Sequence, residues 1–228
     1  MDSDFKKPLS YAVIALVAVF FLWKLFFSGP NISADLESGS TEARLRAVEE
    51  LERLDSASAA ELISKYANDP DLVVARRVII SMGRMKNQVK TEQLLPLLES
   101  PKYEIREAAI IAVGVRGIKG NPEALRKVMV SDPIPSVRAA AVSELAAMRD
   151  WEAMKSFAAL LSDSDLMVQN TAAEAIMRIG GIMHQGFRTN ASAADRQTGI
   201  RFLQHFWQNF KPNHDEFQRY LQIKGNSQ

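Results

Sequence analysis

A short sequence pattern recurs every 31 or 32 residues through the middle of this chain. Each copy starts with an apolar residue and has a small or apolar residue four and eight positions later. The five copies start at Ala43, Val74, Ile105, Val137 and Val168. Positions 0, +4 and +8 share one side of a helix at 3.6 residues per turn. A fixed period of this length is typical of a solenoid, in which each unit buries its apolar face against its neighbours.

A second, shorter apolar pattern precedes each copy, so each unit is predicted to be a helical hairpin. One example is Leu94, Leu97 and Leu98. N-cap or turn residue types stand five positions before each start, as expected where one helix ends and the next begins. They are Ser38, Asp69, Ser100, Asp132 and Asp163.

An arginine follows the first apolar position in three of the five copies. These arginines are Arg44, Arg106 and Arg138, whereas Ala75 and Gln169 replace them in the other two. A row of arginines could bind anions. We favour pairing with an aspartate near the turn, because a guanidinium is well suited to forked, partly buried ion pairs.

Two stretches, residues 100–113 and 132–145, resemble the second half of HEAT repeats. They are similar in particular to the short bacterial HEAT-like repeats of phycobilisome lyases. The resemblance covers residues 41–181 and implies an all-α fold, an α-solenoid of about five HEAT-like helical hairpins. It does not specify an activity, because one fold carries many functions.

An apolar segment over residues 9–27 precedes the repeats, and Lys24 is its only charged residue. Nineteen residues at a helical rise of 1.5 Å span roughly 28 Å, close to the thickness of a bilayer core. Tyr11 and Trp23 stand near its two ends, as aromatic belts do, and Lys24 can reach the interface. We predict an uncleaved transmembrane signal anchor, because no small-x-small cleavage site follows it.

The charges that flank this segment predict its orientation. Lys6 and Lys7 precede it, so residues 1–8 are predicted to be a cytoplasmic tail. The protein would then be a single-pass protein of a bacterial inner membrane, with the repeats in the periplasm. Residues 28–40 are rich in Ser and Gly and are predicted to be a flexible linker.

The repeat register fails after Gly181. We predict that residues 182–228 form a C-terminal helical cap with two helices, over 195–210 and 213–223. Terminal solenoid units are usually atypical, because they close the open end of the core.

An interruption in the polar face suggests a binding surface. Positions +5 and +6 lie away from the buried side, yet the second and third repeats have isoleucine at both. The predicted contact residues are Ile79, Ile80, Ile110 and Ile111, with Glu49 and Glu174 at the ends of the +6 row. We hypothesise that they form a protein contact on the concave surface, since exposed apolar patches often mark interfaces. The alternative is that the C-terminal segment or tight curvature covers them.

Composition argues against most chemistry. The chain has no cysteine, three histidines that all follow the repeats, and a net charge of +1. It contains no P-loop, GxSxG or HExxH motif. We therefore predict no catalytic, cofactor or metal site and no nucleic-acid partner. The predicted function is a non-enzymatic, membrane-anchored scaffold that binds a protein partner. The alternative is an accessory or lyase-type protein that binds a small ligand or chromophore, as the family resemblance allows.

Overall fold

The computed structural model describes residues 31–181 and 192–225. The predicted tail and anchor, including Tyr11, Trp23 and Lys24, lie outside the described residues. Across the described ranges, none of the helices has the length and apolar character needed to span a bilayer. These ranges contain α-helices and 3₁₀-helices and no strand.

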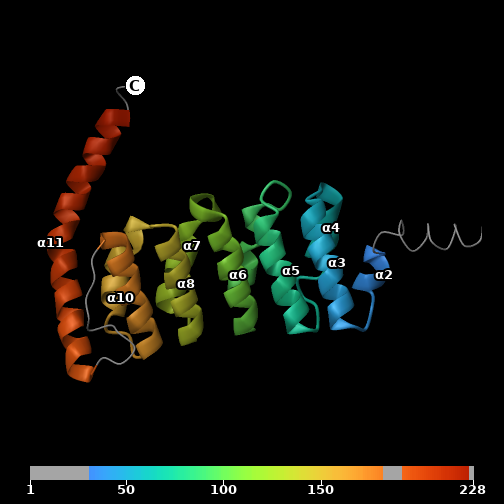
Figure 1. Ribbon diagram of the computed structural model, residues 1–228, viewed down its shortest axis with the longest axis horizontal. Coiled ribbons are helices and arrows are strands. Elements are labelled where there is room, and N and C mark those ends of the chain that lie inside the picture. The colour runs from blue at the N-terminus through green and yellow to red at the C-terminus, as the bar shows by residue number, and fades with distance from the viewer. Residues whose placement is uncertain (1–30, 182–191, 226–228) are drawn as a thin grey trace, which may run out of the picture.

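Five hairpins stack side by side in one row (Figure 1), as the 31-residue period predicts. The pairs are α2 (Ile32–Leu36) with α3 (Thr41–Leu54), α4 (Ala57–Ser64) with α5 (Leu72–Arg84), η1 (Thr91–Gln93) and η2 (Leu95–Glu99) with α6 (Tyr103–Val115), α7 (Pro122–Ser131) with α8 (Pro135–Ala147), and η4 (Trp151–Ala153) and α9 (Met154–Leu160) with α10 (Leu166–Gly180). Another 3₁₀ turn, η3 (Gly117–Gly120), joins α6 to α7. The first elements of the pairs form the A layer, and α3, α5, α6, α8 and α10 form the B layer.

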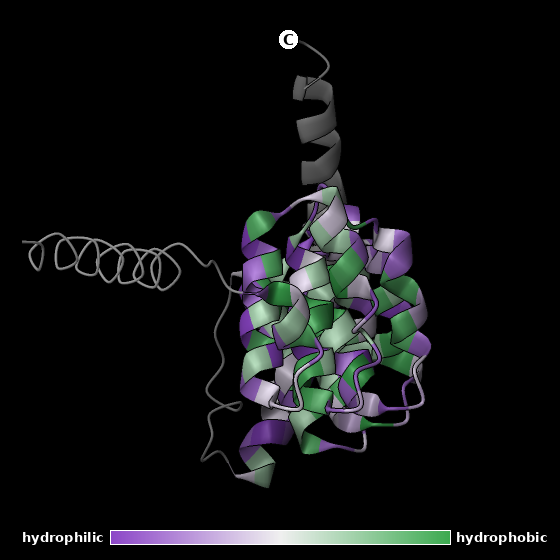
Figure 2. Cartoon of the chain, turned by 90° about the vertical axis from the view of Figure 1, so that its right-hand side faces the viewer, coloured by the Kyte–Doolittle hydropathy of each residue, from purple (hydrophilic) through white to green (hydrophobic). Residues whose placement is uncertain are grey.

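The B-layer helices pack on one another in sequence order, from α3 through α5, α6 and α8 to α10. Their repeating apolar positions form the core; in α5 these are Val74, Val78 and Met82, all buried. Hydrophilic residues, purple in Figure 2, are distributed around the rim of the stack. Helices α5 and α6 approach closely at Gly83, where a Cβ atom would lie 2.5 Å from Cα of Ala112.

The third hairpin departs from the prediction in its A layer. Leu94, Leu97 and Leu98 belong to a segment of two short 3₁₀ pieces, η1 and η2, rather than to an α-helix. Pro96 has no N–H to donate, so an uninterrupted α-helix over 91–99 would lose a backbone hydrogen bond.

The predicted linker is also wrong over part of its length. Residues 32–36 form α2, which packs on α3. The Asn31 side chain caps this helix by accepting a hydrogen bond from the Ala34 N–H, and Leu36 is only 2% exposed. The segment therefore closes the N-terminal end of the core.

At the other end, one helix replaces the two predicted ones. Helix α11 runs over Ala193–Gly225 and continues through Pro212, although proline disfavours helix interiors. It packs on α9 and α10 and buries Ile200 and Leu203. It therefore covers the last hairpin, as a cap does. Residues 182–191 and 226–228 of the predicted cap lie outside the described residues.

Candidate functional site

The repeated arginines pair with aspartates, as predicted. Each ion pair joins one hairpin to the A-to-B turn of the next: Arg44 Nε to Asp69 Oδ2 at 3.3 Å, Arg106 Nε to Asp132 Oδ2 at 2.6 Å, and Arg138 Nη2 to Asp163 Oδ1 at 2.7 Å. Each arginine also donates to the carbonyl oxygen six residues before it, in Ser38, Ser100 and Asp132 respectively. These guanidiniums have their partners within the fold, so this edge stabilises the stack rather than binding an anion.

The aspartates lie in the turns between the two helices of a hairpin, as their residue type predicts, and other residues cap the second helix. In the three hairpins with such an aspartate, the N-cap of the B-layer helix stands two positions after it. These N-cap residues are Asp71, Ile134 and Asp165. Each aspartate carboxylate accepts the N–H of that N-cap residue, at 2.8 to 2.9 Å. The turn is thus fixed by the aspartate, and the helix begins just after it.

These contacts also set the protonation of the groups involved. The hydrogen bond to Asp132 raises the pKa of Arg106. Burial of the Asp163 carboxyl tends to raise its pKa, but hydrogen bonds from Arg138 and from the backbone N–H of Asp165 outweigh burial and lower it.

One link of this series is missing, between the second and third hairpins. Ala75 stands in the arginine position and is fully buried, and Ser100 stands in the matching aspartate position. Both members of the pair are absent together. Gln169 of the fifth hairpin keeps only the backbone contact, with Nε2 donating to the Asp163 carbonyl at 2.6 Å.

The exposed face of the B layer is the predicted contact surface, and the structure divides its residues into two groups. Ile79 and Ile110 are fully buried, so their predicted exposure is wrong. Position +5 lies on the flank of each helix, where the neighbouring hairpin packs. Ile80 and Ile111, at position +6, are partly buried and reach this face.

The two glutamates at the ends of the +6 row, Glu49 and Glu174, are exposed. Helix α11 packs on α9 and α10, at the far end of the row from Ile80 and Ile111 (Figure 1). The alternative in which this helix covers the isoleucines is therefore wrong.

At the α3–α5 end of this face, arginine and glutamate side chains form a network of salt bridges. Arg77 contacts Glu52 at 3.2 Å and Glu49 at 3.7 Å, and Arg84 contacts Glu52 at 3.2 Å. The hydroxyl of Ser81 donates to the same Glu52 carboxylate. These charges are matched within the domain.

Sequence reasoning missed a residue of this face, Glu144 of α8. Its carboxylate lies over Gly114 of α6, where a Cβ atom would come within 2.0 Å of the Oε2 atom. It is partly buried, and burial raises its pKa. No hydrogen bond or salt bridge joins it to another described residue. The one signal in the sequence is a glutamate seven positions into its repeat, facing a glycine nine positions into the preceding repeat.

Gly114 is one helical turn after Ile111 on α6, so the unpaired carboxylate lies over the same face of α6 that carries the isoleucine. A partly desolvated carboxylate with free acceptor positions is suited to a cation or an N–H donor. We call Ile80, Ile111, Gly114, Ser143 and Glu144 the B-face site.

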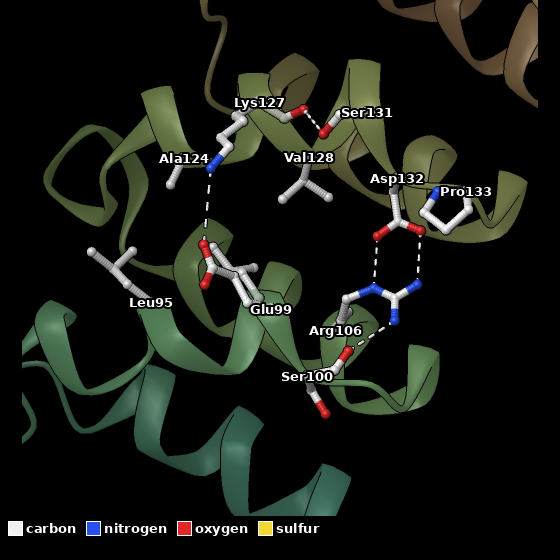
Figure 3. A pocket seen from close by; sticks show the side chains of 11 residues that line it. Leu95, Glu99, Ser100, Arg106, Ala124, Lys127, Val128, Ser131, Asp132 and Pro133 are labelled. Carbon is white, nitrogen blue, oxygen red and sulfur yellow. Dashed lines mark hydrogen bonds and ion pairs between the residues drawn. The ribbon is translucent and has the colours of Figure 1, made fainter.

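A groove of about 480 Å³ opens between η2 and α7 in the A layer. Figure 3 shows Leu95 and Val128 on its walls and an ion pair across it, from Lys127 Nζ to Glu99 Oε1 at 3.9 Å. The Arg106–Asp132 pair lies at one end. No sequence pattern predicted this groove, which is lined in part by the short 3₁₀ segment η2 of the third hairpin.

Metal ligands do not converge within the part of the chain that the structure describes. No group of three or more His, Asp or Glu side chains there is arranged to hold a metal ion.

Comparison with known proteins bears on the fold. The family model described as HEAT repeats matches residues 30–114 and 122–194. A solved structure of the complex of CpcE and CpcF of phycocyanin lyase from Nostoc sp. PCC7120 is similar, with a TM-score of 0.51 and 20% identity. The match covers 67% of this chain and 65% of that one, so this chain spans under two thirds of its length.

An engineered protein is also similar, with a TM-score of 0.46 and 18% identity over 77% of this chain and 94% of that chain. No curated protein matches the sequence. At 20% identity, the likeness to the phycocyanin lyase structure reports on the fold alone.

Proposed function

This chain belongs to the HEAT-repeat family, and from that premise we propose that it is a non-enzymatic scaffold that holds a protein partner on the B-face site. Helical-repeat proteins use their extended surfaces for binding. The observation that carries the proposal is the juxtaposition of the Ile111 side chain with the unpaired Glu144 carboxylate across Gly114.

The site specifies the chemistry of its partner. Ile80 and Ile111 provide an apolar contact, and Glu144 provides an acceptor for a lysine, an arginine or a backbone N–H. Contact with a partner would remove the remaining water from this carboxylate, and a cation would offset that cost. A segment with an apolar side chain next to a basic one fits both requirements.

The complex of CpcE with CpcF supports a protein partner, because it is a protein complex that contains this fold. We further propose that residues 9–27 anchor the chain in a bacterial inner membrane and place the repeats in the periplasm. A C-terminal alkaline phosphatase fusion tests this topology: activity is expected, and an inactive fusion with full expression contradicts it.

Site-specific photo-crosslinking in the source cell tests the scaffold proposal. A photoreactive phenylalanine analogue replaces Ser143 at the B-face site, and Lys127 of the A-layer groove serves as the control position. We expect one discrete adduct from position 143 and none from position 127. The added substitution Glu144→Lys should abolish the adduct, because it places a cation against the partner's cation.

Equal adducts from both positions, or an adduct that Glu144→Lys leaves unchanged, would contradict the proposal. The Glu144 side chain forms no hydrogen bond or salt bridge with another described residue, so we expect its variants to fold. Circular dichroism of the purified variant provides that control.

A second candidate function follows from the A-layer groove, whose volume is suited to a small ligand. The chain would then be an accessory or lyase-type protein that carries such a ligand or chromophore. The absorption spectrum and native mass of the purified full chain separate the two functions. A coloured or mass-shifted protein that loses its ligand on Val128→Trp supports the second candidate.

A further inference from the structure

We propose that a basic pocket binds a phosphate group. It lies at the edge of the stack where each B-layer helix connects to the next A-layer element. The pocket has a volume of about 260 Å³ and lies between two loops, one after α5 and one after α6. It is separate from the B-face site, so this proposal does not depend on the proposed function.

Four basic side chains line the pocket: Lys86, Lys90, Arg116 and Lys119. Glu92 is the one acidic residue among the lining residues, so the local charge is strongly positive. None of the four forms a salt bridge with another described residue, whereas the arginines of the opposite edge are all paired. Bringing four cations together with a single counter-charge, Glu92, is unfavourable unless an anion compensates.

Arg116 provides the geometric argument. Its Nη2 donates to the Met82 carbonyl at 2.9 Å, which fixes the guanidinium against the second hairpin. Its Nε is buried and has no hydrogen-bond partner. Burial also lowers the pKa of this side chain, although nearby Glu92 opposes the effect. A buried N–H without an acceptor is costly, and Arg116 lines the pocket, so an anion bound there would offset the charge of this guanidinium.

A hydrogen bond joins the two loops that form the pocket. The Thr91 hydroxyl donates to the Lys119 carbonyl at 3.4 Å, which ties the start of η1 to the loop after α6. The cations therefore converge from two hairpins on one pocket. A phosphate monoester or inorganic phosphate, with up to two negative charges and several acceptor oxygens, matches this set better than a single carboxylate does.

Thermal unfolding of the full chain in a neutral detergent tests the site. Sodium phosphate is titrated at constant ionic strength against sodium acetate as the control anion. We expect a saturable rise in Tm with phosphate alone. Lys86→Gln and Lys119→Gln, one from each loop, should each raise the apparent Kd for phosphate about tenfold. This is the effect expected from the loss of one charge-assisted contact.

Lys127→Gln is the matched control, because Lys127 is an exposed lysine at the A-layer groove, away from the pocket. It should bind phosphate as the unmodified chain does. A rise in Tm that is unsaturable, equal in acetate, or equal in all three variants would overturn the proposal.

Phosphate can come from solution or from a lipid headgroup. Nanodiscs of phosphatidylcholine with or without phosphatidic acid distinguish these sources. If phosphatidic acid protects Lys119 from acetylation and free phosphate no longer adds to the effect, the headgroup is the source. If only free phosphate protects Lys119, the ligand is soluble. Absence of protection by either would overturn the proposal.

Discussion

The Arg106–Asp132 pair should be a major stabilising contact between the third and fourth hairpins. It is bidentate, with Nε–Oδ2 at 2.6 Å and Nη2–Oδ1 at 2.8 Å. Arg106 is 9% exposed and Asp132 is 8% exposed. The same two hairpins carry a second ion pair, Lys127–Glu99, with a distance of 3.9 Å and side chains that are 78% and 80% exposed. The two pairs differ mainly in burial and geometry, so they form a matched comparison.

Asp132→Ala removes both charge-assisted hydrogen bonds and the acceptor for the Ile134 N–H. Removing one partner of a buried pair costs about 3–5 kcal/mol, because the other charge stays buried. Arg106 keeps its bond to the Ser100 carbonyl at 2.9 Å, which places the cost near the low end, about 3 kcal/mol. Glu99→Ala should cost about 0–1 kcal/mol, since exposed pairs contribute little.

Urea unfolding of the full chain in detergent, followed by circular dichroism, measures these costs. In the double-mutant cycle, Arg106→Leu with Asp132→Ala should be less destabilised than the sum of the single variants, by about 2–3 kcal/mol. The Lys127–Glu99 cycle should show almost no coupling. Equal coupling for the two pairs, or a cost of Asp132→Ala below that of Glu99→Ala, would refute the claim that burial and geometry decide these contributions.

Three further changes have defined outcomes. Glu144→Gln should raise stability at pH 7 and not at pH 4 in urea unfolding, because burial raises the carboxyl pKa in the folded state and ionisation then lowers stability as pH rises above the ordinary value of 4.5. Gly83→Ala should cost about 1–3 kcal/mol, because its Cβ would clash with the backbone at Ala112; Gly39→Ala, with nothing within 4 Å, should be nearly neutral. Asp163 has a lowered pKa, so its stabilisation is present above its ordinary value of 3.8 and is lost as pH falls below it. Asp163→Asn should accordingly reduce the dependence of Tm on pH between pH 5 and pH 3.

The arginine–aspartate pairs could be predicted from the sequence because both partners obey the repeat. Arg106 and Asp132 stand at fixed positions in consecutive units, and stacking identical units brings such positions together. The absence of the pair at Ala75 and Ser100 follows from the same rule. The N-caps stand two residues after these aspartates, because each aspartate fixes the turn before the helix begins.

The B-face site could be predicted only in part. Helical periodicity separates the buried side from the exposed side, and it correctly placed Ile80 and Ile111 near the surface. It could not place Ile79 and Ile110, because a flank position is buried or exposed according to how the next helix packs. Glu144 is a more demanding case, since its environment depends on Gly114 in another hairpin.

The departures from the regular repeat converge on the third hairpin. It lacks the arginine–aspartate link to the second hairpin at Ala75 and Ser100, and 3₁₀ turns replace its first helix. Its α6 helix supplies Ile111 and Gly114 to the B-face site, and Arg116 follows that helix.

Two of these departures lower the stability expected of an ideal stack: the missing ion pair at Ala75 and Ser100, and the buried Arg116 N–H without an acceptor. Locally unfavourable features persist where they serve binding, and the neighbouring regular hairpins supply the stability that offsets them. The third hairpin is therefore where binding variants should concentrate. The regular edge of Arg44, Arg106 and Arg138 is where stability variants should concentrate.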